Sequence, residues 1–314
     1  MPKFSQKEME RLFFNQKIDD SKVIKGPQFG EDAAVIQIDD TYLIVHPDPI
    51  SGAVENIGWL SINIPANDIA VTGANPRWAL PAIQVPDDYG EDKLERIVQD
   101  MIEAASSLNI SLVGGHTETV DDIKRPLVTT NVMGITPNPI FTSDSKPGDF
   151  IVQINEAGIE GTWILASDYG EYLKDTVIRE KTIEEARSWR NDISVVDSAL
   201  KIRDSATSMH DPTEGGIIQG IYEMAFCSKN DFIVEEDVMI RPETVEICDS
   251  LGLDPLKLIS SGCLIATVPK KTSSIDGKII GRVEEGEGDV YYKGKKVEEN
   301  PNDELFRAIK KLKK

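Results

Sequence analysis

The chain is 314 residues long and carries 54 acidic against 34 basic side chains, a formal net charge of −20. Duplex nucleic acid is excluded as the default partner, because phosphate contacts need clustered Lys and Arg and a polyanion repels so acidic a surface. A hydrophobic content of 40% with 28% charged residues excludes a disordered chain and is typical of a globular protein long enough for two domains.

In the first half, short apolar runs alternate with a helical segment. Residues 33–38 and 42–46 predict two strands that pair across a turn at Asp39 and Asp40. Residues 90–107 place apolar side chains at helical spacing and predict a helix that leads into a short strand.

A segment rich in Pro, Ser and Gly at 137–149 predicts a domain boundary, so we expect domains at 1–143 and 144–314. The second half again mixes strands and helices. Strands are expected at 151–154 and 263–268, and helices at 182–206 and 214–228. The expected fold class is therefore α/β, or α+β, with two domains.

Cysteine usage and apolar patterning predict a cytoplasmic protein. The three cysteines form no CxxC pair, which argues against a disulfide framework and against a zinc site. The N-terminal segment is charged from residue 3 and does not have the pattern of a signal peptide. The sequence contains no run of about 18 apolar residues that would predict a membrane span, so no membrane partner is expected.

Four polar motifs interrupt the apolar runs, and each contributes one acid. These acids are Asp32 in GEDAA, Asp48 in HPDP, Asp68 in NDIAVTGA and Asp211 in HDPTEGG. A chain can assemble a Mg²⁺ site beside phosphates from acids that lie in distant motifs. The alternative is that they cap helices and form turns, and this alternative is strong for Asp211, which precedes Pro212. Capping and metal binding are compatible, because helix N-termini also attract phosphate.

The three histidines, His46, His116 and His210, each lie within or beside one of the polar motifs. A three-histidine zinc site is one interpretation, because imidazole suits Zn²⁺ and the ligands need no close spacing in sequence. The surrounding Asp and Gly residues favour phosphate and Mg²⁺ instead, and a structural role for each histidine stays open.

The segment GGHTE at 114–118 has the composition of a phosphate site at the end of a strand. Gly114 and Gly115 allow backbone N–H groups to face an anion, Thr117 supplies a hydroxyl, and Glu118 can hold a metal or orient water. The chain has neither a GxxxxGK[ST] loop nor a GxGxxG turn after a strand. Any nucleotide site must therefore be of another design.

On these residues the chain resembles the superfamily of aminoimidazole ribonucleotide synthetase, the PurM-like proteins, which includes HypE, selenophosphate synthetase and thiamine-monophosphate kinase. The matching segments run in family order: GEDAAVI (30–36), DPISGA (48–53), NDIAVTGANPRW (67–78), GGHTE (114–118), KPGD (146–149), GIEGTWILASD (158–168), HDPTEGGI (210–217) and DPLKLISSGCLIA (254–266). The chain is most similar to the HypE-like branch, including archaeal proteins related to the synthetase.

The resemblance implies a two-domain PurM-like fold and a homodimer in which the N-terminal domains form a shared β-barrel. It implies ATP and Mg²⁺ as cofactors, with Asp32, Asp48 and Asp68 as metal and triphosphate residues. Asn67 would help to hold the nucleotide, and Asp211 would face the same cleft from the second domain. The residues expected to take part in catalysis are Asp48, His116 and Asp211.

Three departures from the family bear on the substrate. His116 stands where many relatives have Asp in a GGDT-type motif, and an imidazole can serve there as a general base or a metal ligand. The chain ends AIKKLKK without the terminal cysteine of HypE, and no cysteine precedes Cys227, which disfavours the HypE reaction on its own tail and selenophosphate synthesis. The DPISGA segment lacks a DGVGTK-type pattern, which weakens purine synthesis.

The predicted function is ATP- and Mg²⁺-dependent activation of a small-molecule or protein-borne acceptor by phosphoryl transfer, with dehydration as a variant. The enzyme would be a HypE-like phosphotransferase or a ligase/dehydratase without the terminal cysteine. Three alternatives stay open: a nucleotide-binding maturation or scaffold partner, a homologue without catalysis, and a kinase similar to thiamine-monophosphate kinase.

Overall fold

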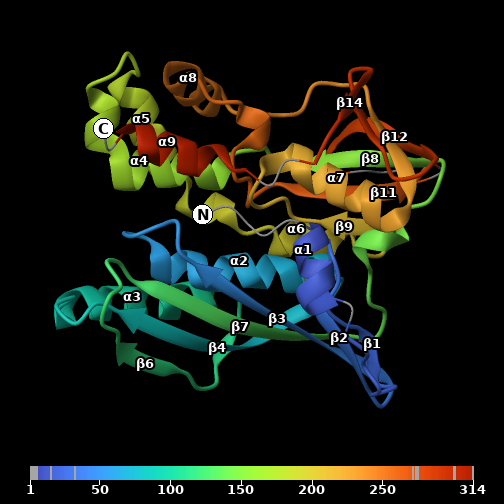
Figure 1. Ribbon diagram of the computed structural model, residues 1–314, viewed down its shortest axis with the longest axis horizontal. Coiled ribbons are helices and arrows are strands. Elements are labelled where there is room, and N and C mark those ends of the chain that lie inside the picture. Colours follow the sequence, from blue (N-terminus) through green and yellow to red (C-terminus); the bar gives the residue numbers. More distant parts are fainter. Residues whose placement is uncertain are drawn as a thin grey trace. The chain divides into compact units, whose positions relative to one another are not determined.

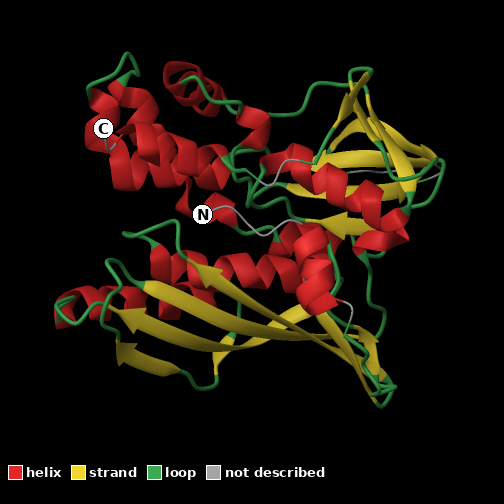
Figure 2. Ribbon diagram, viewed as in Figure 1, coloured by secondary structure: helices red, strands yellow, loops and turns green. Residues whose placement is uncertain are grey.

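The computed structural model describes residues 6–14, 16–31, 33–270, 272, 276–299 and 302–312, and these form two compact units (Figure 1). The N-terminal unit comprises Asp19–Gly26 and Ala33–Pro139. The C-terminal unit comprises the described residues of Met1–Ile18, Pro27–Asp32 and Ile140–Lys314. Each unit combines one sheet with helices (Figure 2), which confirms the expected mixed, two-domain fold class.

The N-terminal unit is a sheet of seven strands with two helices, α2 (Ile57–Val71) and α3 (Glu91–Ser107). The strands are β1 (Val23–Lys25), β2 (Ala34–Ile38), β3 (Thr41–Ile50), β4 (Asn75–Val85), β5 (Ser111–Leu112), β6 (His116–Thr119) and β7 (Leu127–Thr136). Their order is β1-β2-β3-β7-β4-β5, and β6 also pairs with β4. Helix α2 packs against β3 and β7, and α3 packs against α2 (Figure 1).

The hairpin expected in the first half is present. Strands β2 and β3 pair antiparallel, with Ile38 opposite Thr41. Asp39 takes a φ of 52° in the turn between them, a left-handed conformation that Asp tolerates better than most residues. The helix expected at 90–107 is α3, which starts one residue later.

Helix α2 is buried along its whole length. A Cβ on Gly58 would lie 2.2 Å from the carbonyl oxygen of Ile97 in α3, so only glycine permits this close crossing of the two helices. On the sheet side, a Cβ on Gly134 of β7 would lie 2.4 Å from Ile69 Cγ2 of α2. The helix is therefore held tightly between the sheet and α3.

Within the described residues, no helix has the length and apolarity needed to cross a bilayer.

The C-terminal unit holds the second sheet, with strand order β14-β13-β10-β12-β8-β11-β9. Its strands are β8 (Asp149–Ile154), β9 (Ser208–His210), β10 (Asn230–Val234), β11 (Leu264–Pro269), β12 (Lys278–Glu285), β13 (Val290–Tyr292) and β14 (Lys295–Val297). Its helices are α1 (Gln6–Met9), α4 (Ile159–Lys174), α5 (Glu180–Arg187), α6 (Val196–Ile202), α7 (Gly216–Ser228), α8 (Pro242–Leu251) and α9 (Glu304–Leu312). Shorter helical turns are η1 (Glu10–Phe14), η2 (Thr142–Asp144), η3 (Trp189–Ile193) and η4 (Pro255–Lys257).

The core of this unit lies between the sheet and α7 (Figure 1). Ile221 and Met224 of α7 pack with Phe232, Ile265 and Val283 of the strands. The strands expected at 151–154 and 263–268 are β8 and β11, and the helix expected at 214–228 is α7. These three predictions are therefore confirmed within a few residues.

The long helix expected at 182–206 is wrong, because the segment folds as α5, η3 and α6. Ser194 has extended backbone, with ψ at 129°, and interrupts the helical run. Its hydroxyl accepts a hydrogen bond from the Val196 N–H at 3.3 Å, which favours a new helix start there. Trp189 of η3 is buried, so burial of its side chain stabilises the turn between the helices.

The segment before β2 joins the C-terminal unit through Glu31. The Glu31 carboxylate accepts hydrogen bonds from the backbone N–H groups of Thr142 and Ser143, each at 3.1 Å. Cys227 Sγ donates to the Phe29 carbonyl oxygen at 3.1 Å in the same region. These contacts explain why the described residues of Pro27–Asp32, which precede β2 in the sequence, belong to the C-terminal unit.

Candidate functional site

Three side chains that can bind a metal converge in the N-terminal unit. His46 and Asp48 lie two residues apart on β3, so both point to the same face of the sheet. Asp68 lies on α2, which packs on that face. One ligand atom from each residue lies within 4.8 Å of the other two, and His46 Nε2 is 3.2 Å from Asp68 Oδ2. We refer to His46, Asp48 and Asp68 as the β3–α2 cluster.

Burial makes the β3–α2 cluster chemically distinctive. The side chain of Asp68 is 5% exposed and that of His46 is 13% exposed. Carboxylates placed together away from water require a cation or hydrogen-bond donors, because an isolated buried charge is costly. The site therefore has the charge and the donor atoms to hold a divalent cation.

The structure brings together two of the acids expected to bind metal and nucleotide, Asp48 and Asp68. Asp32 lies outside the described residues. Asn67 precedes Asp68 on α2 and is fully buried, but adjacent residues on a helix point roughly 100° apart. His46, which the sequence suggested only as a ligand in the alternative zinc site, was not among the residues expected to bind ATP and Mg²⁺. The signal for it was its place in the HPDP motif, two residues before Asp48.

His116 and Glu118 lie on the opposite face of the same sheet. Strand β6 pairs with β4 so that His116 is opposite Ala82 and Glu118 is opposite Gln84. These positions alternate with the buried Ile83, whose side chain points to the α2 side of the sheet. A single chain therefore does not bring Glu118 to the β3–α2 cluster.

The two exposed side chains interact with each other instead. His116 Nε2 is 3.4 Å from Glu118 Oε2, and Gln84 Nε2 donates to Glu118 Oε1 at 2.9 Å. The hydrogen bond from Gln84, followed by that from His116, holds the pKa of Glu118 below its ordinary value. Because His46 and His116 lie on opposite faces of the N-terminal sheet, a single chain does not bring these two histidines to one zinc ion.

Of the two glycines before β6, Gly115 has a structural explanation and Gly114 has none. A Cβ on Gly115 would lie 2.7 Å from the Pro81 carbonyl oxygen of β4, so glycine is needed for the approach of two strands. A Cβ on Gly114 would meet Leu80 Cδ2 at an ordinary 3.6 Å. Thr117 is exposed on β6. The expected roles of Gly114, Gly115 and Thr117 in phosphate binding stay predictions.

Asp211 follows β9 in the C-terminal unit and is 1% exposed. It is not the N-cap of α7, because that position is Gly215. Its neighbour His210 is also buried, with Nε2 2.9 Å from Glu223 Oε2 of α7. Gln219 Nε2 donates to the other oxygen of Glu223 at 3.0 Å. The HDPTEGG motif is thus tied to α7, and a joint role of Asp211 with the β3–α2 cluster stays a prediction.

Asp303 is a buried acid that the sequence did not reveal. It accepts hydrogen bonds from the N–H groups of Gly215 at 2.8 Å and Leu305 at 2.7 Å, and so supports the starts of α7 and α9. Burial raises the pKa of Asp303 to about 7, an effect that the two N–H groups partly oppose. No motif surrounds it, so only the tertiary contact with Gly215 identifies it.

The cysteines do not form a reactive centre. Cys248 and Cys263 are buried, and burial raises the pKa of both thiols, to about 12 in Cys248. Since the thiolate is the reactive form, both are inert small core residues. Cys227 is half-buried.

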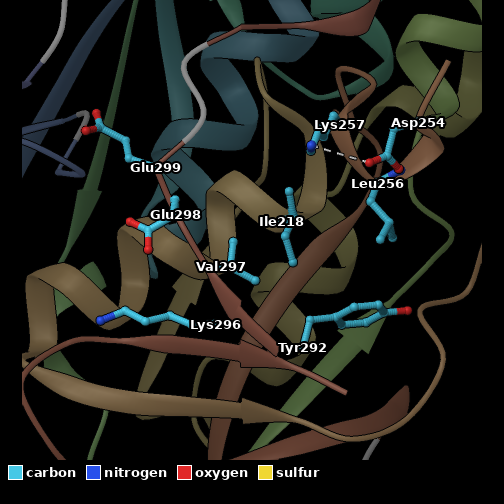
Figure 3. A pocket seen from close by; sticks show the side chains of 9 residues that line it. All are labelled: Ile218, Asp254, Leu256, Lys257, Tyr292, Lys296, Val297, Glu298 and Glu299. Carbon is cyan, nitrogen blue, oxygen red and sulfur yellow. Dashed lines mark hydrogen bonds and ion pairs between the residues drawn. The ribbon is translucent and has the colours of Figure 1, made fainter. Parts of the chain in front are cut away.

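A pocket of about 450 Å³ lies in the C-terminal unit beside α7, η4 and the β13–β14 hairpin (Figure 3). Its lining residues are Ile218, Asp254, Leu256, Lys257, Tyr292, Lys296, Val297, Glu298 and Glu299. Both lysines already have acidic neighbours: Lys257 Nζ is 3.6 Å from Asp254, and Lys296 Nζ is 2.7 Å from Asp289. The pocket therefore offers an apolar wall and mixed charge, which does not favour a phosphate group.

Comparison with known families matches both halves of the chain. The model described as AIR synthase related protein, N-terminal domain, matches residues 30–136, and its C-terminal counterpart matches residues 146–293. Among curated relatives, thiamine-monophosphate kinase of Pyrococcus abyssi is 29% identical over 285 residues, 86% of this chain and 87% of that protein. Carbamoyl dehydratase HypE of Rhizobium leguminosarum bv. viciae is 27% identical over 218 residues, 68% of this chain and 60% of that protein.

Solved structures show the same fold. The structure of AaThiL complexed with AMPPCP and TMP has a TM-score of 0.76 at 22% identity and covers 93% of each chain. The HypE–HypF complex has a TM-score of 0.70 at 20% identity, covering 90% of this chain and 93% of that one. The predicted PurM-like superfamily, with its HypE-like branch, is confirmed, and the named relatives are enzymes, as expected of this family.

Proposed function

Because the chain belongs to the AIR synthase-related family, we propose that it is an enzyme that uses ATP and a divalent metal to phosphorylate an acceptor. The observation that carries the proposal is the convergence of Asp48 and Asp68 with His46 in the β3–α2 cluster. Phosphoryl transfer demands mainly that donor and acceptor are held in line and that phosphate charge is neutralised. A kinase and a dehydratase among the relatives support an ATP-driven reaction.

The residues present fit a divalent metal. Asp48 and Asp68 would hold the ion, which supplies charge neutralisation for the phosphates when bound. The contact of α2 with β7 at Gly134 and with α3 at Gly58 fixes the position of Asp68. Asp32 and Asn67 would complete the nucleotide site, and Mg²⁺ is the ion that the family resemblance implies.

The acceptor is an oxygen atom of a small molecule or of a protein-borne group. Its oxygen attacks the γ-phosphorus, the new P–O bond forms, the bond to the β-phosphate oxygen breaks, and ADP leaves. In the dehydration variant, the C–O bond of the phosphorylated amide then breaks, the nitrogen gives up its two protons as the C≡N bond forms, and the oxygen departs as inorganic phosphate. A kinase acting on thiamine monophosphate is the second candidate, favoured by the 86% coverage of this chain by the Pyrococcus abyssi relative.

A homodimer is proposed from the outer face of the N-terminal sheet. Val45, Met133, Trp78 and Leu80 occupy this face along β3, β7 and β4, and Leu80 is 37% exposed. An apolar sheet face exposed to water favours association with a second sheet. His116 also lies on this face, so its expected catalytic role would be exerted next to the partner.

Two further assignments are a partner and a location. Similarity to a HypE chain that forms the HypE–HypF complex supports a maturation-protein partner. The three free cysteines, Cys227, Cys248 and Cys263, are consistent with the proposed cytoplasmic location.

Asp48→Asn tests the proposal. We expect affinity for Mg-ATP, measured by calorimetry, to fall roughly 100-fold, because an amide replaces a charged ligand. Phosphorus NMR of the wild-type mixture should show slow formation of ADP and phosphate. The matched control is Asp40→Asn, an exposed acid in the β2–β3 turn, which should bind like the wild type. Unchanged affinity in Asp48→Asn, with the fold intact by circular dichroism, would remove the support for this site.

A further inference from the structure

His46 gives the β3–α2 cluster a donor atom that a purely carboxylate magnesium site lacks. Two ligands bound to one ion at 2.0–2.2 Å lie about 3 to 3.5 Å apart, and the His46 Nε2 to Asp68 Oδ2 distance of 3.2 Å is in this range. The side chains come from two elements packed together, so the nitrogen and the carboxylates face one another without rearrangement.

A second, independent observation lies on the neighbouring strand. Thr130 of β7 is directly opposite Asp48 in the antiparallel ladder, so the two side chains are on the same face. Thr130 is 0% exposed, and its hydroxyl has no hydrogen-bond partner among the described residues. A buried hydroxyl without a partner costs free energy, which a water or an oxygen ligand of a bound ion would remove.

The donor set determines which ion is preferred. Mg²⁺ favours oxygen ligands in regular octahedral geometry and retains several waters. Imidazole suits first-row transition ions, whose affinity for nitrogen and oxygen sites rises from Mn²⁺ through Co²⁺ to Cu²⁺ and falls again at Zn²⁺. A histidine among two carboxylates therefore shifts selectivity away from Mg²⁺.

We propose that His46 Nε2, with the carboxylates of Asp48 and Asp68, forms a mixed nitrogen and oxygen site that prefers a transition ion such as Mn²⁺ or Co²⁺ to Mg²⁺. This inference rests on the proposed function, because it concerns the same metal site. It changes the expected cofactor of this chain from the family's magnesium to a transition ion.

Pulsed electron paramagnetic resonance of the wild-type protein with MnCl₂ tests the coordination directly. The expected result is modulation from a directly bound imidazole nitrogen, which changes on labelling histidine with ¹⁵N. His116→Asn, the matched control on the opposite face of the sheet, should keep this signal. Bound Mn²⁺ without nitrogen modulation in the wild type would overturn the proposal, whatever the stability of any His46 variant.

Calorimetric titration with CoCl₂ and MgCl₂, without nucleotide, measures the preference. We expect the wild type to bind Co²⁺ at least about tenfold more tightly than Mg²⁺. In His46→Asn, Co²⁺ affinity should fall about tenfold or more while Mg²⁺ affinity changes little. Equal affinities of the wild type for the two ions, or equal losses in the variant, would overturn the proposal.

The two proposals fail in different ways. Wild-type protein that binds Mg-ATP through Asp48 but shows no histidine nitrogen bound to Mn²⁺ would contradict only the inference about His46. Wild-type protein that binds Mn²⁺ through a histidine nitrogen but does not bind ATP with any divalent ion would contradict only the proposed ATP-dependent function.

Discussion

The close crossing of α2 and α3 makes Gly58→Ala a sensitive test of how the β3–α2 cluster is held. The new Cβ would lie 2.2 Å from the Ile97 carbonyl oxygen and 2.9 Å from Asp100 Cβ. Comfortable non-bonded separation is about 3.5 Å, so the helices must move apart by about 1 Å. The clashing atom belongs to backbone, which cannot rotate away as a side chain can.

The magnitude follows from two opposing effects. Overpacking against a rigid neighbour costs up to about 3 kcal/mol, and replacing glycine by alanine inside a helix returns about 1 kcal/mol. We therefore expect Gly58→Ala to lower the free energy of unfolding by about 2 kcal/mol. Displacement of α2 also moves Asp68 relative to His46, so divalent-ion affinity should fall by about tenfold.

Urea denaturation and metal titration of the same preparation measure both effects. Gly114→Ala is the matched control, because its added Cβ meets only Leu80 Cδ2, at 3.6 Å. Its free energy of unfolding should stay within about 0.5 kcal/mol of the wild type. A Gly58→Ala protein as stable as the wild type would refute the tight crossing. A destabilised variant with normal metal affinity would refute the link between that crossing and Asp68.

Two further predictions concern the C-terminal unit. Hydrogen bonds from the Arg179 side chain and then its backbone lower the pKa of Glu246 from its ordinary 4.5 to about 2, so this pair stabilises the fold above pH 4.5 and loses its effect as pH falls towards 2. Glu246→Gln should therefore lower the free energy of unfolding by about 1 kcal/mol at pH 7 and leave it unchanged near pH 2. The value at pH 7 is small because Arg179 is largely exposed. Urea denaturation at several pH values measures the difference, and a difference independent of pH would contradict the assignment. A thiol reagent should modify Cys227 in the native protein and leave Cys248 and Cys263 unmodified until unfolding, because both are buried with raised pKa values. Mass spectrometry of labelled peptides checks this order, and early modification of Cys263 would contradict it.

Local patterns were enough to predict several elements of the fold. The β2–β3 hairpin and α3 follow from alternating or helical spacing and from a turn at Asp39. The break after α5 was not predictable in this way, because it depends on the burial of Trp189 and the backbone of Ser194. Hydrophobic periodicity in the sequence shows which face of a helix or strand is apolar, whereas the end of α5 depends on which other elements pack against that face.

The candidate site shows the same division. Motifs marked Asp48 and Asp68, but their meeting with His46 requires α2 to pack on β3, which no spacing in the chain encodes. The face on which Glu118 lies depends on the pairing of β6 with β4, and a shift of one residue would reverse it. The motif composition alone therefore could not separate His116 and Glu118 from the cluster.

The alternation along β3 and β7 has a consequence for how this protein can be altered. Val45 and Met133 lie on the outer face, while His46 and Val132, their immediate neighbours in sequence, lie on the inner one. Substitutions at the outward-facing positions therefore change one surface of the sheet and leave the side chains of the β3–α2 cluster in place. Adjacent residues in these strands therefore belong to two different surfaces, the outer face proposed for dimer formation and the inner face that carries the β3–α2 cluster.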